Sequence, residues 1–175
     1  MPPASAVWQH RCVDLAEHNA LSDAEAARAL AAVCAAPRWV DAMIASRPFG
    51  SLDELLRQAD DALDQLTAAD LDAALAGHPK IGARPSGTGG EQSRREQSGV
   101  DPGDAELAEG LAEGNRAYEA RFGRIYLVCA SGLSGPELLA ILRDRLDNDA
   151  DTELVVTRAE LGKINRLRLE RLVTA

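Results

Sequence analysis

Apolar residues recur along this chain at the three- and four-residue spacing of amphipathic helices. The clearest stretch follows Ser51, where six apolar side chains share one helical face: Leu52, Leu55, Leu56, Ala59, Leu63 and Leu66. Similar spacing predicts helices from Ala105 to Phe122, from Ser134 to Leu146 and from about Thr152 to Val173, and Gly123 is a suitable stop for the first of these. Helices therefore dominate the predicted fold.

Serine–glutamate pairs three residues apart predict where several helices begin. In such a capping box the serine hydroxyl accepts a hydrogen bond from a backbone amide of the first turn, and the carboxylate reaches back to the serine amide. Three pairs fit: Ser22 with Glu25, Ser51 with Glu54, and Ser134 with Glu137.

Two segments interrupt the helical pattern. From Gly77 to Gly103 the chain is rich in Gly, Pro, Ser and Thr, and only Glu91 to Ser98 could form a short helix, so this region is an ordered functional loop or a linker. The apolar run from Ile125 to Ala130 could be a strand, but no partner strand is evident, so we expect it to be extended, buried and unpaired. The predicted fold is all-α, a single-domain helical bundle over residues 1–175 with a Gly/Pro-rich active-site loop and one short extended apolar segment.

Length and charge narrow the class of protein. A chain of 175 residues can bury one core without disulfides or metals. Its net charge of −9 disfavours nucleic acid and anionic membrane surfaces as partners. The three cysteines, Cys12, Cys34 and Cys129, are too scattered for a disulfide framework, no apolar run is long enough to span a bilayer, and the N-terminus has no leader pattern. We expect a cytoplasmic protein.

His78 lies in Gly-His-Pro-Lys-Ile-Gly, directly before the glycine-rich region. Pro79 keeps the histidine out of the helical backbone conformation and stiffens the turn. Because imidazole titrates near neutral pH, a histidine fixed on such a turn suits a general acid. The alternative is a histidine that caps a helix carbonyl or is simply solvated.

Ser93, Glu96 and Gln97 would share one face of the short predicted helix, because they are three and four residues apart. That face would present a hydroxyl, an acid and an amide together. The alternative is a solvated polar helix.

Arg168 falls in the middle of an apolar stripe formed by Leu154, Leu161, Ile164 and Leu172. Because an unpaired buried charge costs several kcal/mol, an arginine in this position should be paired or should bind an anion. The alternatives are a structural ion pair and a side chain that extends to the rim.

Metal and phosphate sites have weaker support. His10, Cys12 and His18 match no ligand spacing of a known metal site, and we interpret them as non-functional. Residues 87–90, Gly-Thr-Gly-Gly, lack the strand and the lysine of a phosphate-binding loop. We therefore expect no metal site.

Several motifs together resemble the 2-oxo-4-hydroxy-4-carboxy-5-ureidoimidazoline (OHCU) decarboxylase family, over nearly the whole chain. In chain order they are R-W-V-x-x-M-x-x-x-R-P-F (38–49), H-P-K-I-G (78–82), S-R-R-E-Q (93–97), N-x-x-Y-x-x-x-F-G (115–123), the apolar run 126–130 and K-I-x-x-L-R-L (163–169). The chain departs from the family where an aromatic commonly follows Phe-Gly, since Arg124 and Ile125 stand there, and it carries Pro37 and Arg38 before the tryptophan.

The resemblance implies a set of site residues. His78 and Glu96 would be catalytic, and Pro79, Ser93, Gln97 and Arg168 would bind substrate. The backbone segment of the family's pocket would fall on Tyr126, Leu127, Val128, Cys129 and Ala130.

The resemblance also implies a reaction and partners. The family is all-helical and usually dimeric, and it converts the anionic substrate OHCU to (S)-allantoin and carbon dioxide in urate breakdown without metal or organic cofactor. We therefore expect a homodimer with no nucleic acid or membrane partner, and a possible association with the preceding hydrolase of the pathway. Two alternatives stay open: a non-catalytic helical scaffold of purine degradation, and a decarboxylase for a related ureido acid.

Overall fold

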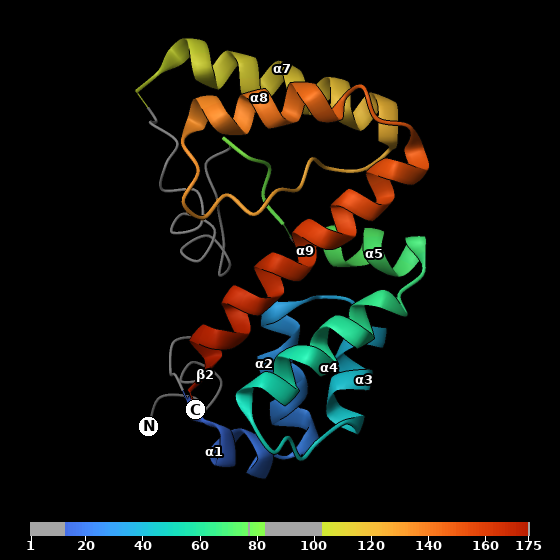
Figure 1. The fold of residues 1–175 in the computed structure, drawn as a ribbon, viewed down its shortest axis with the longest axis vertical. Helices are drawn as coiled ribbons and strands as arrows, with labels where there is room; N and C mark the ends of the chain where they lie inside the picture. The colour runs from blue at the N-terminus through green and yellow to red at the C-terminus, as the bar shows by residue number, and fades with distance from the viewer. Residues whose placement is uncertain (1–12, 77, 83–102, 175) are drawn as a thin grey trace. The chain divides into compact units, whose positions relative to one another are not determined.

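The computed structural model describes residues 13–76, 78–82 and 103–174, and helices make up most of them (Figure 1). The helices are α1 (Leu15–Ala20), α2 (Asp23–Val33), α3 (Pro37–Ala45), α4 (Leu52–Asp64), α5 (Ala68–Leu75), α7 (Ala105–Phe122), α8 (Gly135–Arg145) and α9 (Ala150–Leu172). The prediction of an all-α fold is confirmed. The single domain over residues 1–175 stays a prediction.

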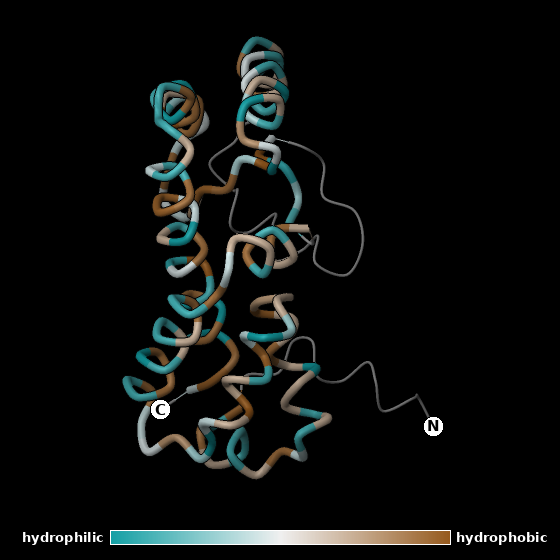
Figure 2. Tube along the Cα trace, turned by 90° about the vertical axis from the view of Figure 1, so that its right-hand side faces the viewer, coloured by the Kyte–Doolittle hydropathy of each residue, from teal (hydrophilic) through white to brown (hydrophobic). Residues whose placement is uncertain are grey.

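The chain divides into two compact units. One runs to Ala74 and resumes at Gly162, and the other extends from Leu75 to Leu161, so α9 supplies residues to both. In Figure 2 apolar and polar positions alternate along the helices, as expected for elements that bury one side.

In the first unit, the family motif around Trp39 joins α3 to α4. The Trp39 ring is fully buried, and its Nε1 donates a hydrogen bond to the Ala59 carbonyl oxygen over 3.0 Å. The side-chain amide of Asn19 bonds both backbone groups of Phe49, with Nδ2 2.8 Å from the carbonyl oxygen and Oδ1 2.9 Å from the amide nitrogen. The predicted apolar face after Ser51 is buried except for Leu52, which is half-buried.

Two of the three predicted capping boxes are confirmed: Ser22 with Glu25, and Ser134 with Glu137. The third is half wrong. The Ser51 hydroxyl caps the Glu54 amide, but the Glu54 carboxylate accepts from the Gly50 amide (2.7 Å) in place of the serine amide. Helix α9 begins about two residues earlier than predicted, because the Asp149 carboxylate caps the Thr152 amide over 2.8 Å.

In the second unit, α7 and α8 lie side by side (Figure 1). Gly114 explains how they approach so closely, because a Cβ atom at that position would lie 2.5 Å from Leu142 Cδ2. Helix α7 ends as predicted at Gly123, in the left-handed conformation. Its buried face forms one hydrophobic core with α8 and with the apolar segment that joins the two helices.

A two-residue parallel pairing, absent from the prediction, joins β1 (Val13–Asp14) to β2 (Val173–Thr174). Val13 lies opposite Val173, and both side chains are buried. Among the helices that the structure describes, none is long and apolar enough to cross a bilayer.

Candidate active site

His78 lies on a tight turn immediately after α5. Its backbone amide donates to the Leu75 carbonyl oxygen over 2.9 Å, and its side chain and that of Pro79 are half-buried. The turn continues to Gly82, whose φ of 80° is a conformation that favours glycine. The short H-P-K-I-G motif therefore fixes the backbone that presents the imidazole.

Helix α7 anchors this turn through residues of the N-x-x-Y motif. Asn115 is buried, and its side-chain amide donates to the carbonyl oxygens of Ile81 (3.1 Å) and Leu111 (2.7 Å). Lys80 forms an ion pair with Glu119, with 2.7 Å between Nζ and Oε1. Ile81 is buried in the core of the second unit. Asn115 is thus a supporting residue of the His78 turn, a role that the sequence pattern did not assign.

The segment from Ile125 to Ala130 has no helical or strand structure and no sheet partner within the described residues, and Ile125 and Cys129 are half-buried where the prediction had the whole run buried. Four of its side chains are buried: Tyr126, Leu127, Val128 and Ala130. Charged side chains bind its backbone in place of a neighbouring strand. Arg145 Nη1 donates to the Leu127 carbonyl oxygen over 2.7 Å, and the Cys129 amide donates to the Glu160 carboxylate over 2.8 Å.

Arg145 belongs to a buried polar cluster that the sequence analysis missed. Its guanidinium pairs with Glu153, with 2.9 Å between Nε and Oε1, and stacks over the ring of Tyr126 at 5.0 Å. The Tyr118 hydroxyl and the Asn148 amide also donate to Glu153. In the sequence, Arg145 and Glu153 each look like a solvated charged residue on a helix. Only their contact in the structure identifies them as a buried ion pair.

Hydrogen bonding determines the charge state of this cluster. Burial raises the pKa of Glu153, but the hydrogen bonds from Arg145 and two neutral donors outweigh burial, so its pKa lies below the usual value. Burial raises the pKa of Tyr118, and so does the neighbouring Glu153. At neutral pH Glu153 is therefore ionised, Arg145 is positively charged, and the protonated Tyr118 hydroxyl is hydrogen-bonded to Glu153.

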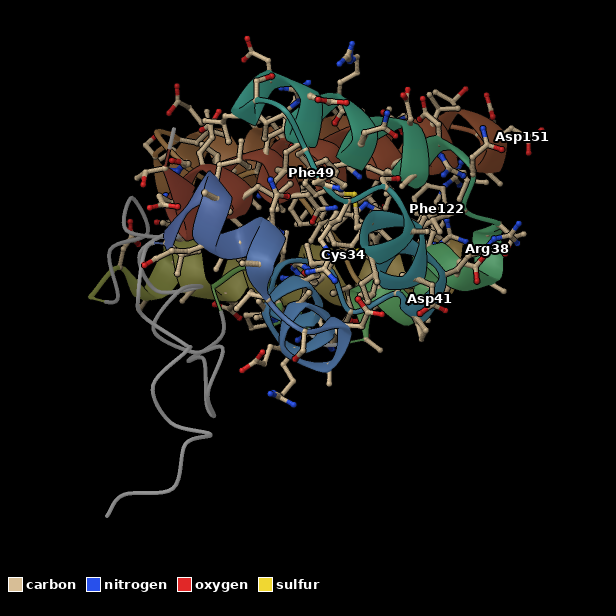
Figure 3. All side chains as sticks on the ribbon, turned by 90° about the horizontal axis from the view of Figure 1, so that it is seen from below. Cys34, Arg38, Asp41, Phe49, Phe122 and Asp151 are labelled. Carbon is tan, nitrogen blue, oxygen red and sulfur yellow. The ribbon has the colours of Figure 1, made fainter. Side chains whose placement is uncertain are left out.

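Arg168 lies in the first unit and is 9% exposed, as its place in the apolar stripe predicted. Its Nη1 donates to the Val33 carbonyl oxygen over 3.1 Å. Cys34 and Asn165 are close by, and both are buried. Burial raises the pKa of the Cys34 thiol, although Asn165 and Arg168 both lower it. The thiol therefore stays protonated at neutral pH. In Figure 3 Cys34 lies inside the unit, whereas Arg38 points outward from α3.

Three predicted site residues, Ser93, Glu96 and Gln97, lie outside the described residues, as do His10 and Cys12. The described residues contain no group of three His, Cys, Asp or Glu side chains that could bind a metal ion. The predicted site residues that the structure describes are therefore the His78 turn and the 126–130 segment in one unit, and Arg168 in the other.

His18, the third member of the rejected metal set, is a core residue. Its ring is fully buried and stacks on Phe49, with 6.2 Å between ring centroids. Neither ring nitrogen has a hydrogen-bond partner among the described residues. Burial lowers the pKa of His18, and the positive charge of Arg47 lowers it further.

We expect His18 to make stability pH-dependent. The unfolded chain protonates His18 near pH 6.5, whereas the folded chain does so only at lower pH. The contribution of neutral His18 to the free energy of unfolding is therefore complete above about pH 6.5. It is lost as the pH falls toward the pKa of His18 in the folded chain, by at most about 1.4 kcal/mol per pH unit for one proton. Urea unfolding at pH 7.5 and 5.5 should show a smaller loss for His18→Leu than for the wild type. Equal losses would contradict this assignment.

Three comparisons place the chain among known proteins. The profile of the OHCU decarboxylase family matches residues 19–170. A uric acid degradation bifunctional protein of Arabidopsis thaliana is 31% identical over 79% of this chain, which spans only 44% of that protein's length. The OHCU decarboxylase of Xenopus laevis is 31% identical, over 76% of this chain and 78% of its own.

A solved structure agrees with these sequence matches. The crystal structure of an OHCU decarboxylase in the presence of (S)-allantoin superposes with a TM-score of 0.71 at 30% identity. The match covers 87% of this chain and 98% of that one. The similarity therefore includes both compact units.

Proposed function

Because the chain belongs to the OHCU decarboxylase family, we propose that it removes carbon dioxide from OHCU to give (S)-allantoin in urate degradation. The observation that carries this proposal is the family match over residues 19–170, together with the solved decarboxylase that the chain covers almost completely. The enzyme is a lyase of the decarboxylase type.

The substrate's own chemistry supports a reaction without an organic cofactor. Loss of carbon dioxide leaves an electron pair on carbon, and the ring imine and carbonyl of OHCU are conjugated with that carbon and can accept the charge. The protein then has two tasks: to meet the developing charge with positioned donors, and to deliver a proton to one face of the ring. Protonation on one face sets the S configuration.

We assign the roles as follows. His78 transfers the proton, Arg168 orients the anionic substrate, and Glu96 and Gln97 bind the ureido and ring groups. Pro79, Ser93 and the 126–130 segment complete the pocket. The anchored turn of His78 and the buried position of Arg168 support these roles, because both side chains are held where solvent does not compete fully.

The proposal is tested by making OHCU from urate with uricase and the hydrolase, adding the protein, and following circular dichroism. We expect enantiopure (S)-allantoin to form faster than in the uncatalysed reaction, and the activity to survive exhaustive EDTA treatment. A rate equal to the uncatalysed one would leave a scaffold as the better hypothesis. Activity that is lost in EDTA and restored by a divalent ion would contradict the cofactor-free mechanism.

We expect Arg168→Lys to weaken substrate binding although the charge is kept. A planar guanidinium can donate two parallel hydrogen bonds to a carboxylate, whereas an ammonium meets it as a point charge. Loss of one charged hydrogen bond, about 1.5–3 kcal/mol, corresponds to a roughly 10- to 100-fold rise in KM. Steady-state kinetics measure it, and unchanged kinetics would make Arg168 a structural residue that binds only within the protein.

We also propose that the protein is a homodimer and that it associates with the preceding hydrolase. The similarity to a bifunctional protein of uric acid degradation supports the second proposal. Light scattering during size-exclusion chromatography measures the mass in solution and so tests for the homodimer. A mass equal to one chain at micromolar concentration would exclude the dimer.

A further inference from the structure

The 126–130 segment alternates between two environments. The side chains of Tyr126, Val128 and Ala130 belong to the core formed with α7 and α8, whereas those of Leu127 and Cys129 do not. Such alternation is produced by an extended backbone, in which successive side chains point to opposite faces. The backbone amide and carbonyl groups of such a chain also alternate, so residues 127 and 129 direct theirs to one edge and residues 126 and 128 to the other.

Two charged side chains occupy the first edge. Arg145, at the end of α8, binds the Leu127 carbonyl, and Glu160, from α9, binds the Cys129 amide. An arginine supplies the donor and a glutamate supplies the acceptor that a neighbouring strand would otherwise provide. The two contacts are 2.7 and 2.8 Å long, typical of charge-assisted hydrogen bonds.

Helix α9 carries both carboxylates that support this edge, Glu153 through Arg145 and Glu160 directly. Arg145 is almost completely buried in its ion pair with Glu153. Glu153 and Glu160 are seven residues apart on α9, which is close to two helical turns, so both carboxylates lie on the same face of the helix. The segment is therefore attached to one face of α9, directly through Glu160 and indirectly through Arg145 and Glu153.

Within the described residues, the second edge is open at Val128. Val128 is 5% exposed, and among the described residues nothing bonds to its amide or its carbonyl. Buried backbone groups nearly always have a partner, so an open edge in a buried segment indicates where a ligand or a water binds. A ureido group offers an N–H donor beside a C=O acceptor, which is the complement of the two backbone groups of one residue.

We propose that Arg145 and Glu160 are positioning residues: they bind one edge of the 126–130 segment so that the Val128 amide and carbonyl, on the other edge, bind the ureido or ring amide of the substrate. The proposal rests on the proposed function for the identity of the ligand. It adds two residues to the site and specifies which backbone groups of the segment contact the substrate.

Glu160 is the better residue for a test, because it is half-buried and lies outside the ion pair. Glu160→Gln keeps an oxygen that can accept from the Cys129 amide, and Glu160→Ala removes it. Because a misplacement of about 1 Å can cost on the order of 10²-fold, we expect the Ala variant to lose about 10- to 100-fold in kcat/KM, chiefly through KM. The Gln variant should stay within a few-fold of wild type, and Glu113→Ala, which removes an exposed carboxylate of α7, should match wild type.

A second measurement needs no catalysis. In nitrogen-15 NMR spectra, titration with (S)-allantoin should shift the Val128 amide signal of the wild type and of Glu160→Gln, and shift it much less in Glu160→Ala. The Cys129 amide should exchange slowly with solvent in the first two proteins and fast in the third. Should the Ala variant fail to fold, Glu160→Asp, shorter by one methylene, replaces it with the same expectation.

The outcomes separate this proposal from the proposed function. If the wild type shows no decarboxylation but its Val128 signal shifts with allantoin, the proposed function is wrong and the positioning role stands. An active wild type with an equally active Glu160→Ala, or Gln and Ala variants impaired to the same extent, would overturn the positioning role. So would an unshifted Val128 signal in the wild type at saturating allantoin.

Discussion

Replacing His78 with asparagine is expected to lower turnover by about 10²- to 10⁴-fold, the usual contribution of a general acid or base. Asparagine can still form hydrogen bonds from this position, but it has no proton to exchange near neutral pH. The fold should persist, because the backbone hydrogen bond from His78 to Leu75 and the hydrogen bond from Asn115 to Ile81 hold the turn and do not depend on the side chain at position 78. Substrate binding should therefore change less than turnover.

The measurement is kcat for OHCU across pH. A wild-type limb in the range where histidine titrates, near pH 6.5 before any local shift, should be absent from the variant's residual rate. His10→Asn is a suitable control because it lies outside the family motifs. His18→Asn is unsuitable, since the His18 ring is buried in the core. Wild-type turnover and pH dependence in His78→Asn would make His78 a turn residue and leave Glu96 as the proton-transfer group.

Replacing Glu153 with leucine is expected to destabilise the protein by about 3–5 kcal/mol, the usual result of removing one partner from a buried ion pair. Arg145 would keep its charge in a buried position, and Tyr118 and Asn148 would lose an acceptor. For a chain of this size the loss corresponds to a melting temperature lower by on the order of 10 °C. Thermal unfolding followed by circular dichroism measures it.

An exposed pair provides the matched control. Arg166 and Asp60 form an ion pair whose side chains are 44% and 39% exposed, so Asp60→Ala should cost less than about 1 kcal/mol. The double variant Arg145→Met with Glu153→Leu should recover part of the loss, because it leaves no unpaired charge. A cost for Glu153→Leu no larger than that for Asp60→Ala would show that the pair contributes nothing beyond a surface contact.

The parts of the fold that were predictable are those that depend on neighbours in sequence. The helix ending at Gly123 and the boxes at Ser22 and Ser134 follow from spacing alone. The box at Ser51 was half wrong because the Glu54 carboxylate had a competing amide one residue upstream. The pairing of β1 with β2 joins residues about 160 positions apart, and two residues leave no periodic signal.

For the site, too, local patterns were predictable from the sequence and long-range contacts were not. The stripe around Arg168 and the stiff turn at His78 are local patterns, and in the structure Arg168 is buried and His78 lies on a turn after α5. Arg145 and Glu160 could not be found, because a helix charge that binds a distant backbone group looks the same in sequence as a solvated one. The partner is recognisable only once the extended segment lies beside α8 and α9.

The short pairing of Val13 with Val173 brings the first and last described strands of the chain into contact. The two strands are about 160 positions apart in the sequence, so their pairing closes the described chain on itself, a geometry that tolerates circular permutation.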